Sequence, residues 1–338
     1  MSGILFDRRA FVKIAGLTAG ALAIPPLRRI AAAAARESYP KGKITLIVPN
    51  KPGGGYDIFA RVISPYVTKY LKNPAAGATG GEIVVKNEPA SSGRKGLAMI
   101  FNAPRHGYTI GIMDSGVITD DILGQPEYDY GKFTFLSQAV KMSPVIVTSK
   151  KGYHHWQEVM SEMKKGPVKI AVGSFARTNH AMCILATEMM KANFKIINFP
   201  GTMEAANALM RGDVHLFFGA EDAVRPLVEA GELRPVLTFT ANSGFPGVST
   251  VKDVGFPDLL ESLSSARFLI APPGIEAEPR RLLIAALQKA DKDDKFAAWA
   301  KQNKANLAHL YGNEAGQAYQ NLAKFYADNT AIFKKYLK

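Results

Sequence analysis

The stretch that decides the fold is residues 44–71, which read ITLIVPNKPGGGYDIFARVISPYVTKYL. Its first part, Ile44 to Pro49, is a short apolar run of the kind that forms a buried strand. From Phe59 to Leu71 apolar residues recur on one side of a helix. Three glycines lie between the two parts, where they let the backbone turn sharply and come close to a ligand. The stretch therefore predicts a strand, a glycine loop and a helix.

This glycine loop has the character of an anion-binding site. It contains Gly54, Gly55, Tyr56 and Asp57, and Asp57 can cap the helix that follows. The first N–H groups of that helix have no partner inside it and point toward the loop. A tight turn without a ligand explains the glycines equally well. The spacing is neither G-x-G-x-x-G nor G-x-x-x-x-G-K-S/T, so dinucleotides and nucleoside triphosphates are not favoured.

The N-terminus has the pattern of an export signal. Residues 7–13, DRRAFVK, resemble a twin-arginine motif, and an apolar run follows over residues 14–24. That run is too short to span a bilayer, which takes about 20 residues. Small residues before Arg36 suit a signal peptidase. We expect residues 1–36 to be a signal peptide cleaved near Ala35, and the mature protein to lie in the periplasm.

The charge of the chain argues against some partners. The net charge is +13, and residues 1–36 hold six of the 42 Lys and Arg and one of the 29 acidic residues, which leaves +8. This surplus is spread along the chain, so nucleic acid is not an expected partner. A mild positive field suits small organic anions, although a solvated basic surface explains the same charge. The sole cysteine, Cys183, has no disulfide partner and is predicted to be a packing residue.

The rest of the chain predicts two α/β units. Strands alternate with helices over residues 44–113, and the same alternation returns over residues 168–240. The segment after Phe133 and the strand Arg267 to Ala271 are interpreted as the two crossings. We therefore expect one domain of residues 37–142 plus 264–338, with the helix predicted over residues 317–336 covering it, and a second domain of residues 143–263. Parallel sheets bind ligands beyond the carboxyl ends of their strands, so a cleft between the domains is predicted.

The second unit repeats the arrangement of strand, glycine loop and helix that begins the first unit. Its first strand is followed by a loop that contains Gly173, Ser174, Arg177 and Thr178, and then by a helix. Arg177 can pair with a carboxylate in forked geometry, or it can be a solvated loop charge. His180, near the start of the helix, is expected to be structural.

Signals for catalysis or metal binding are weak. There is no G-x-S-x-G, no H-E-x-x-H and no cysteine with a clear base. His154 and His155 are adjacent and point to different sides of a helix, without a third metal ligand nearby. We expect neither an enzyme nor a metal or cofactor site, although loop residues such as Asp114 and Asp222 leave chemistry open.

Several motifs together resemble one receptor family. They are spread over nearly all of residues 40–336, and they read IVPNKPGGGYD at 47–57, NEPASSG at 87–93, PRHGYT at 104–109, GDVHLFF at 212–218, GELRP at 231–235, FPGVSTV at 245–251 and APPG at 271–274. In these motifs the chain resembles the Bug-type substrate-binding receptors of tripartite tricarboxylate transporters. The loop over residues 199–202, FPGT, departs from the family by lacking a lysine, and Phe175 is bulkier than usual.

The resemblance implies a type II periplasmic binding protein fold, in which two α/β domains joined by two crossing strands close on a small mono-, di- or tricarboxylate. It also implies membrane transporter components as partners. An exported sensor that reports to a membrane kinase, or less favourably an enzyme, would share these features. The resemblance and the loop chemistry together place the ligand against Gly54, Gly55, Tyr56, Asp57, Ser115, Gly173, Ser174, Arg177, Thr178 and Asp222.

Overall fold

The computed structural model describes residues 39–53, 55–72, 80–122, 128–173, 178–241, 243–303 and 305–336. The predicted signal peptide lies outside these residues, as do Gly54, Ser174 and Arg177 of the predicted site. Within the described ranges, no helix combines the length and the apolar character needed to cross a membrane.

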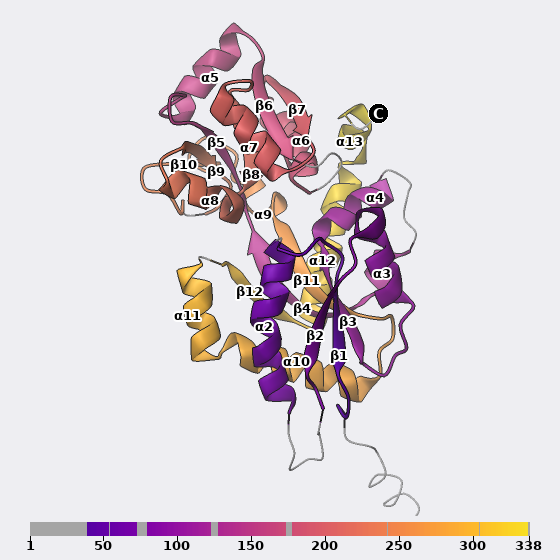
Figure 1. The fold of residues 1–338 in the computed structure, drawn as a ribbon. Coiled ribbons are helices and arrows are strands. Elements are labelled where there is room, and N and C mark those ends of the chain that lie inside the picture. Colours follow the sequence, from indigo (N-terminus) through magenta and orange to yellow (C-terminus); the bar gives the residue numbers. More distant parts are fainter. Residues whose placement is uncertain are drawn as a thin grey trace, which may run out of the picture. The chain divides into compact units, whose positions relative to one another are not determined.

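The structure is built on two six-stranded sheets with helices on their faces (Figure 1). The first sheet has the order β12-β4-β11-β3-β1-β2 and the second has the order β10-β9-β5-β8-β6-β7. The strands of the first sheet are β1 (Ile44–Val48), β2 (Ile83–Asn87), β3 (Thr109–Asp114), β4 (Thr134–Met142), β11 (Ser265–Ala271) and β12 (Leu307–Tyr311). Those of the second are β5 (Pro144–Ser149), β6 (Val168–Gly173), β7 (Phe194–Phe199), β8 (Leu216–Ala220), β9 (Leu233–Thr238) and β10 (Ser249–Thr250).

The helices follow the strands along the chain. They are α2 (Gly55–Leu71), α3 (Arg94–Phe101), α4 (Ile118–Ile122), α5 (Trp156–Lys165), α6 (Thr178–Met189), α7 (Thr202–Arg211), α8 (Glu221–Glu229), α9 (Leu259–Ser262), α10 (Ala277–Asp291), α11 (Asp294–Gln302), α12 (Asn313–Asp328) and α13 (Thr330–Tyr336). Both predicted units of alternating strands and helices are therefore present.

Alternating side chains of β1 explain how the first sheet is covered on both faces. Ile44 and Leu46 join the apolar cluster formed with α2 and α10, whereas Ile47 points the other way and packs with Leu97 and Ile100 of α3. Successive side chains of a strand point to opposite faces, so a continuous apolar run is needed where both faces are buried. This run fixes the place of α2, and with it the loop that precedes α2.

The second sheet is also covered on both faces. Ile170 of β6 packs in the cluster of α6, and Ala171 packs with Leu209 of α7 on the other face. Cys183 of α6 is fully buried, and burial raises the pKa of its thiol. Its predicted role as a packing residue is confirmed.

Both sheets are mixed, whereas the alternation of strands and helices predicts parallel ones. Strand β11 runs antiparallel to β3 and β4, and β5 runs antiparallel to β8 and β9. The reason is the crossing of the chain: only Ser143 separates β4 from β5, and β11 enters the first sheet beside β4, with Ser265 opposite Met142. The parallel prediction holds for β1 with β2 and β3, and for β6 with β7 and β8.

The end of the chain differs from expectation. Of the segment 317–336, α12 lies on the first sheet, but α13 packs on α6 of the second sheet. Lys335 and Tyr336 both donate hydrogen bonds to Glu188 of α6, at 2.7 and 2.5 Å. Phe333 of α13 is fully buried in the same cluster as Tyr326 of α12 and the apolar side chains of α6. One apolar core therefore continues from the first sheet to the second through the last two helices.

Candidate ligand-binding site

A cavity of about 1250 Å³ lies where the carboxyl ends of strands from both sheets meet. Its walls include the loop after β1, the end of β3, the end of β6 and the start of α8. Open α/β sheets bind ligands at this edge, beyond the ends of their strands. The structure thus brings the first glycine loop and the two described ends of the second, Gly173 and Thr178, to one site.

Five of the described helices begin at this cavity, and their first residues line it: Gly55 of α2, Arg94 of α3, Thr178 of α6, Thr202 of α7 and Glu221 of α8. The first N–H groups of a helix lack partners within it and carry a partial positive charge. The first turns of α7 and α8 already hold acidic residues, and the first N–H of α3 is bonded to carbonyls of the turn before it, whereas α6 has no acidic residue in its first turn. The starts of α2 and α6 are therefore the better places for an anion.

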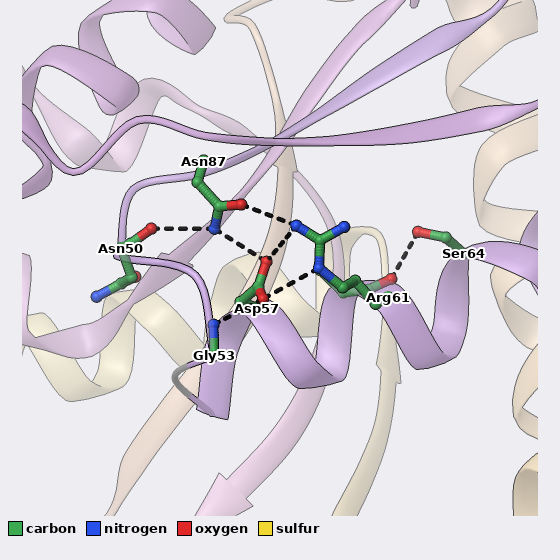
Figure 2. A network of polar contacts seen from close by, with 7 residues as sticks. Asn50, Gly53, Asp57, Arg61, Ser64 and Asn87 are labelled. Carbon is green, nitrogen blue, oxygen red and sulfur yellow. Dashed lines mark hydrogen bonds and ion pairs between the residues drawn. The ribbon is translucent and has the colours of Figure 1, made fainter.

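The acidic residue in the first turn of α2 is turned away from the cavity. Asp57 is 3% exposed and is not among the lining residues. Figure 2 shows its carboxylate held by Gly53, Arg61 and Asn87. The Gly53 N–H donates to Oδ2 at 2.9 Å, Arg61 Nε donates to Oδ2 at 3.0 Å, and Asn87 Nδ2 donates to Oδ1 at 2.9 Å. These donors, Arg61 foremost, lower the pKa of Asp57 to about 2.

This network fixes the first glycine loop. Asn87, at the end of β2, also donates to the carbonyl of Asn50 at 3.1 Å (Figure 2). The two ends of the loop, at Asn50 and Asp57, are therefore tied to the neighbouring strand. The structure gives Asp57 the role of holding the loop rather than a place in the cavity wall.

Ser115 is also placed away from the cavity wall. It is fully buried, and its Oγ accepts a hydrogen bond from the Ala266 N–H of β11 at 3.1 Å. The neighbouring Asp114 lines the cavity instead. Its Oδ1 accepts from the Gly116 N–H at 2.6 Å and from Thr178 Oγ1 at 3.3 Å. The contact between Asp114 and Thr178 joins the first sheet to the second.

A buried arginine forms a second contact between the sheets. Arg267 of β11 is 9% exposed and lines the cavity. Its Nη2 lies 3.4 Å from Oδ2 of Asp222 in α8, and its guanidinium carbon lies 4.6 Å from the ring centre of Tyr56. Burial raises the pKa of the Tyr56 hydroxyl, and the nearby Asp114 adds to that effect. Three residues far apart in the sequence thus meet at the base of the cavity.

The charges around the cavity balance among the described residues. Five basic and five acidic residues line it, and they are Lys51, Arg94, Lys141, Arg225, Arg267, Asp114, Asp120, Glu221, Asp222 and Glu229. Arg94 pairs with Asp120 at 3.3 Å, and Arg225 pairs with Glu221. Among the described lining residues the formal charges therefore cancel, and no net positive field arises from them.

The predicted site residues fall into three groups. Gly55, Tyr56, Gly173, Thr178 and Asp222 line the cavity, Asp57 and Ser115 lie behind its wall, and Gly54, Ser174 and Arg177 lie outside the described residues. His180, expected to be structural, is 2% exposed, and burial lowers its pKa to about 4. Within the described part of the chain, no group of three or more His, Cys, Asp or Glu residues is placed to hold a metal ion.

Sequence reasoning missed Arg267. It stands in SSARFLIAPPG as a charged residue at the start of an apolar strand, which is a common place for a solvated end. A weak local signal for burial was present, because the apolar run FLIA follows the arginine directly. The partners, however, come from α2 and α8, which no local pattern connects to β11.

The comparisons with known proteins agree with this geometry. The family model described as the tripartite tricarboxylate transporter family receptor, TctC, matches residues 67–337. Protein BugT of Bordetella pertussis is 26% identical over 282 residues, which is 80% of this chain and 83% of BugT.

Solved structures show the same fold. MatC from Rhodopseudomonas palustris, with bound malate, has a TM-score of 0.71 at 20% identity, over 86% of this chain and 100% of MatC. A second R. palustris protein, with adipate, has a TM-score of 0.70 at 21% identity, over 88% and 98%. The predicted fold class, a type II periplasmic binding protein fold, is confirmed. With most of its length matched by the family model, the chain belongs to the TctC family of tripartite tricarboxylate transporter receptors.

Proposed function

We propose that this receptor captures a small organic carboxylate in the cavity between its two sheets and delivers it to the membrane components of a tripartite tricarboxylate transporter. The observation that carries the proposal is the cavity itself, in which the starts of α2 and α6 and the guanidinium of Arg267 converge. Helix N-termini and buried guanidinium groups are both suited to a carboxylate. The two solved structures of this fold that hold malate and adipate support this class of ligand.

The ligand contacts proposed are main-chain groups and side chains at the cavity. From the described residues these are Gly55, Tyr56, Gly173 and Thr178, and Asp222 lines the same cavity. Gly54, Ser174 and Arg177 are further candidates on the sequence alone. Asp57 and Ser115 support the wall from behind.

The receptor would work by closure of two domains. The proposed division follows the sheets, with residues 37–142 and 264–338 in one domain and residues 143–263 in the other. The exception is α13, which packs on the second sheet. A ligand that contacts both walls stabilises the closed form by the contacts it makes only there. Export by the twin-arginine signal at residues 1–36 would place the receptor in the periplasm.

Thermal unfolding with a panel of organic acids tests the proposal. The panel comprises succinate, malate, citrate, adipate and benzoate, with the matching amides as controls. An acid present at about 100 times its dissociation constant adds about 2.7 kcal/mol to the free energy of unfolding, which raises the melting temperature measurably. Native mass spectrometry of the gently purified protein identifies a ligand that is carried through. A panel in which no acid raises the melting temperature contradicts the proposal, and so does turnover of a bound acid.

A further inference from the structure

The guanidinium of Arg267 is buried with few acceptors. Its only described ion-pair contact is with Asp222 at 3.4 Å, and its buried Nε has no acceptor among the described residues. A guanidinium carries five N–H donors, and its charged hydrogen bonds to carboxylates are usually about 2.7–2.9 Å long. Burial of a charged group with so few acceptors is costly, so a closer acceptor in the cavity would stabilise this guanidinium.

The surroundings hold this guanidinium in one place. The ring of Tyr56 lies against it, with the guanidinium carbon 4.6 Å from the ring centre. Gly55 leaves the room it occupies, because a Cβ on Gly55 would lie only 2.9 Å from Arg267 Nη2. In β11, Arg267 is opposite Asp114 of β3 and Val140 of β4, so its backbone is fixed inside the sheet. The donors of Arg267 are thus preorganised at the cavity.

Asp222, unlike the buried and fixed Arg267, is exposed. Its side chain is 39% exposed and stands in the first turn of α8, the helix that follows β8 of the second sheet. A carboxylate at the start of a helix is stabilised there without Arg267, so it can leave the arginine at little cost. The long contact and the exposed side chain describe a carboxylate that another carboxylate can replace.

We propose that Arg267 is the side chain that binds the carboxylate of the ligand, and that Asp222 occupies its place in the ligand-free protein. This inference rests on the proposed function and adds the specificity-determining residue. A ligand carboxylate that takes the place of Asp222 can accept from Nη2 at about 2.7–2.9 Å, the usual length of a charged hydrogen bond, whereas Asp222 lies at 3.4 Å. The exchange also removes one direct tie between the sheets and replaces it with the ligand.

The two partners predict effects of opposite sign. Arg267→Gln should weaken binding of the tightest acid of the panel by about 10-fold or more, because charged hydrogen bonds to a carboxylate are lost. Arg267→Lys keeps the charge without the fork and should fall between wild type and Arg267→Gln. Asp222→Asn removes the competing charge and should strengthen binding. Arg211→Gln, at an exposed ion pair with Asp213, is the matched control and should leave affinity unchanged.

Isothermal titration calorimetry with each variant decides the matter, and melting without ligand checks that each variant is folded. If the wild type binds an acid and Arg267→Gln binds it equally well, this inference is wrong and the proposed function stands. Weaker binding by Asp222→Asn would make Asp222 a ligand contact and overturn the exchange. If Arg267→Gln does not fold, the other two variants test the inference: Arg267→Lys should still weaken binding, and Asp222→Asn should still strengthen it. A wild type that binds no acid of the panel contradicts both proposals.

Discussion

Arg61 lies one turn after Asp57 on α2 and holds both of its carboxylate oxygens, with Nε 3.0 Å from Oδ2 and Nη2 3.0 Å from Oδ1. Such a forked pair is among the stronger hydrogen-bonded arrangements in proteins. Asp57 is buried and Arg61 is half exposed, so water screens the ion pair only around the Arg61 side chain. The pair anchors the loop that leads into the cavity.

Asp57→Asn should lower the free energy of unfolding by about 1 kcal/mol at pH 7, after allowance for solvent around Arg61. The folded protein lowers the pKa of Asp57 to about 2, below its ordinary value. The contribution of the carboxylate is therefore complete above about pH 4 and is lost as the pH falls through about 2. Urea unfolding at pH 7 and pH 3 measures it, with Asp213→Asn at an exposed ion pair as the control. A difference that does not shrink at pH 3 would contradict the assignment.

Gly173→Ala should destabilise the protein by about 1–3 kcal/mol, because the added methyl overpacks a rigid place. A Cβ there would lie 2.7 Å from the backbone nitrogen of Thr202 and 2.8 Å from the backbone carbon of Gly201. Gly166→Ala is the matched control, since a Cβ at Gly166 meets nothing within 4 Å. Chemical unfolding of both variants measures the difference, and equal stability of the two would show that α7 shifts freely.

Gly55→Ala should separate folding from binding. The position begins α2, and the atoms that the methyl meets are the end of a side chain and not backbone, so stability should fall little. The methyl would lie 2.9 Å from Nη2 of Arg267 and push the guanidinium aside. We expect a nearly unchanged melting temperature together with weaker acid binding by calorimetry. Unchanged affinity would mean that the position of Arg267 is unimportant for the ligand.

Tyr326→Phe should be neutral or slightly stabilising, within about 1 kcal/mol, because the hydroxyl it removes is buried without a partner among the described residues. Tyr39→Phe is the contrast, since its buried hydroxyl donates to the Gly107 carbonyl at 2.7 Å. That variant should lose about 1 kcal/mol. Thermal unfolding of both tests the pair, and a larger loss for Tyr326→Phe would reveal an acceptor for its hydroxyl.

Phe333→Ala should cost about 3–5 kcal/mol, the usual range for removing a buried aromatic ring. Phe333 is fully buried and stacks on Tyr326, with ring centres 5.4 Å apart. Met203→Ala, at a side chain 54% exposed, is the control and should change stability by less than about 0.5 kcal/mol. Urea unfolding gives both values, and a small loss for Phe333→Ala would show that α13 is not part of the core.

The fold was largely predictable because its signals are local. The apolar run of β1, the glycines and the one-sided stripe of α2 lie within 28 consecutive residues. The strand β12 was missed because LAHLY includes a polar residue and sits at the edge of its sheet, where burial is incomplete. The direction of β11 was also missed, since it depends on where the chain returns from the second sheet.

The candidate site was predictable only as far as its backbone. Glycines and helix starts mark the loops, so Gly55, Gly173 and Thr178 were found. Whether a side chain faces the cavity depends on distant partners. Asn87, which follows Asp57 by 30 residues, helps to turn Asp57 away from the cavity. Arg267 is held at the cavity by its contacts with Tyr56 and Asp222, which lie far from it in the sequence.

The attachment of α13 to α6 matters for anyone who builds a biosensor from this receptor. Tyr336, the last described residue of α13, donates a hydrogen bond to Glu188 of α6, which packs on the second sheet. A fluorescent reporter fused after α13 would therefore be attached to a helix that is held against α6. Labels intended to test the proposed closure therefore belong elsewhere, for example at Ile58, which lines the cavity, and at Met203, which follows the lining residue Thr202; both side chains are exposed.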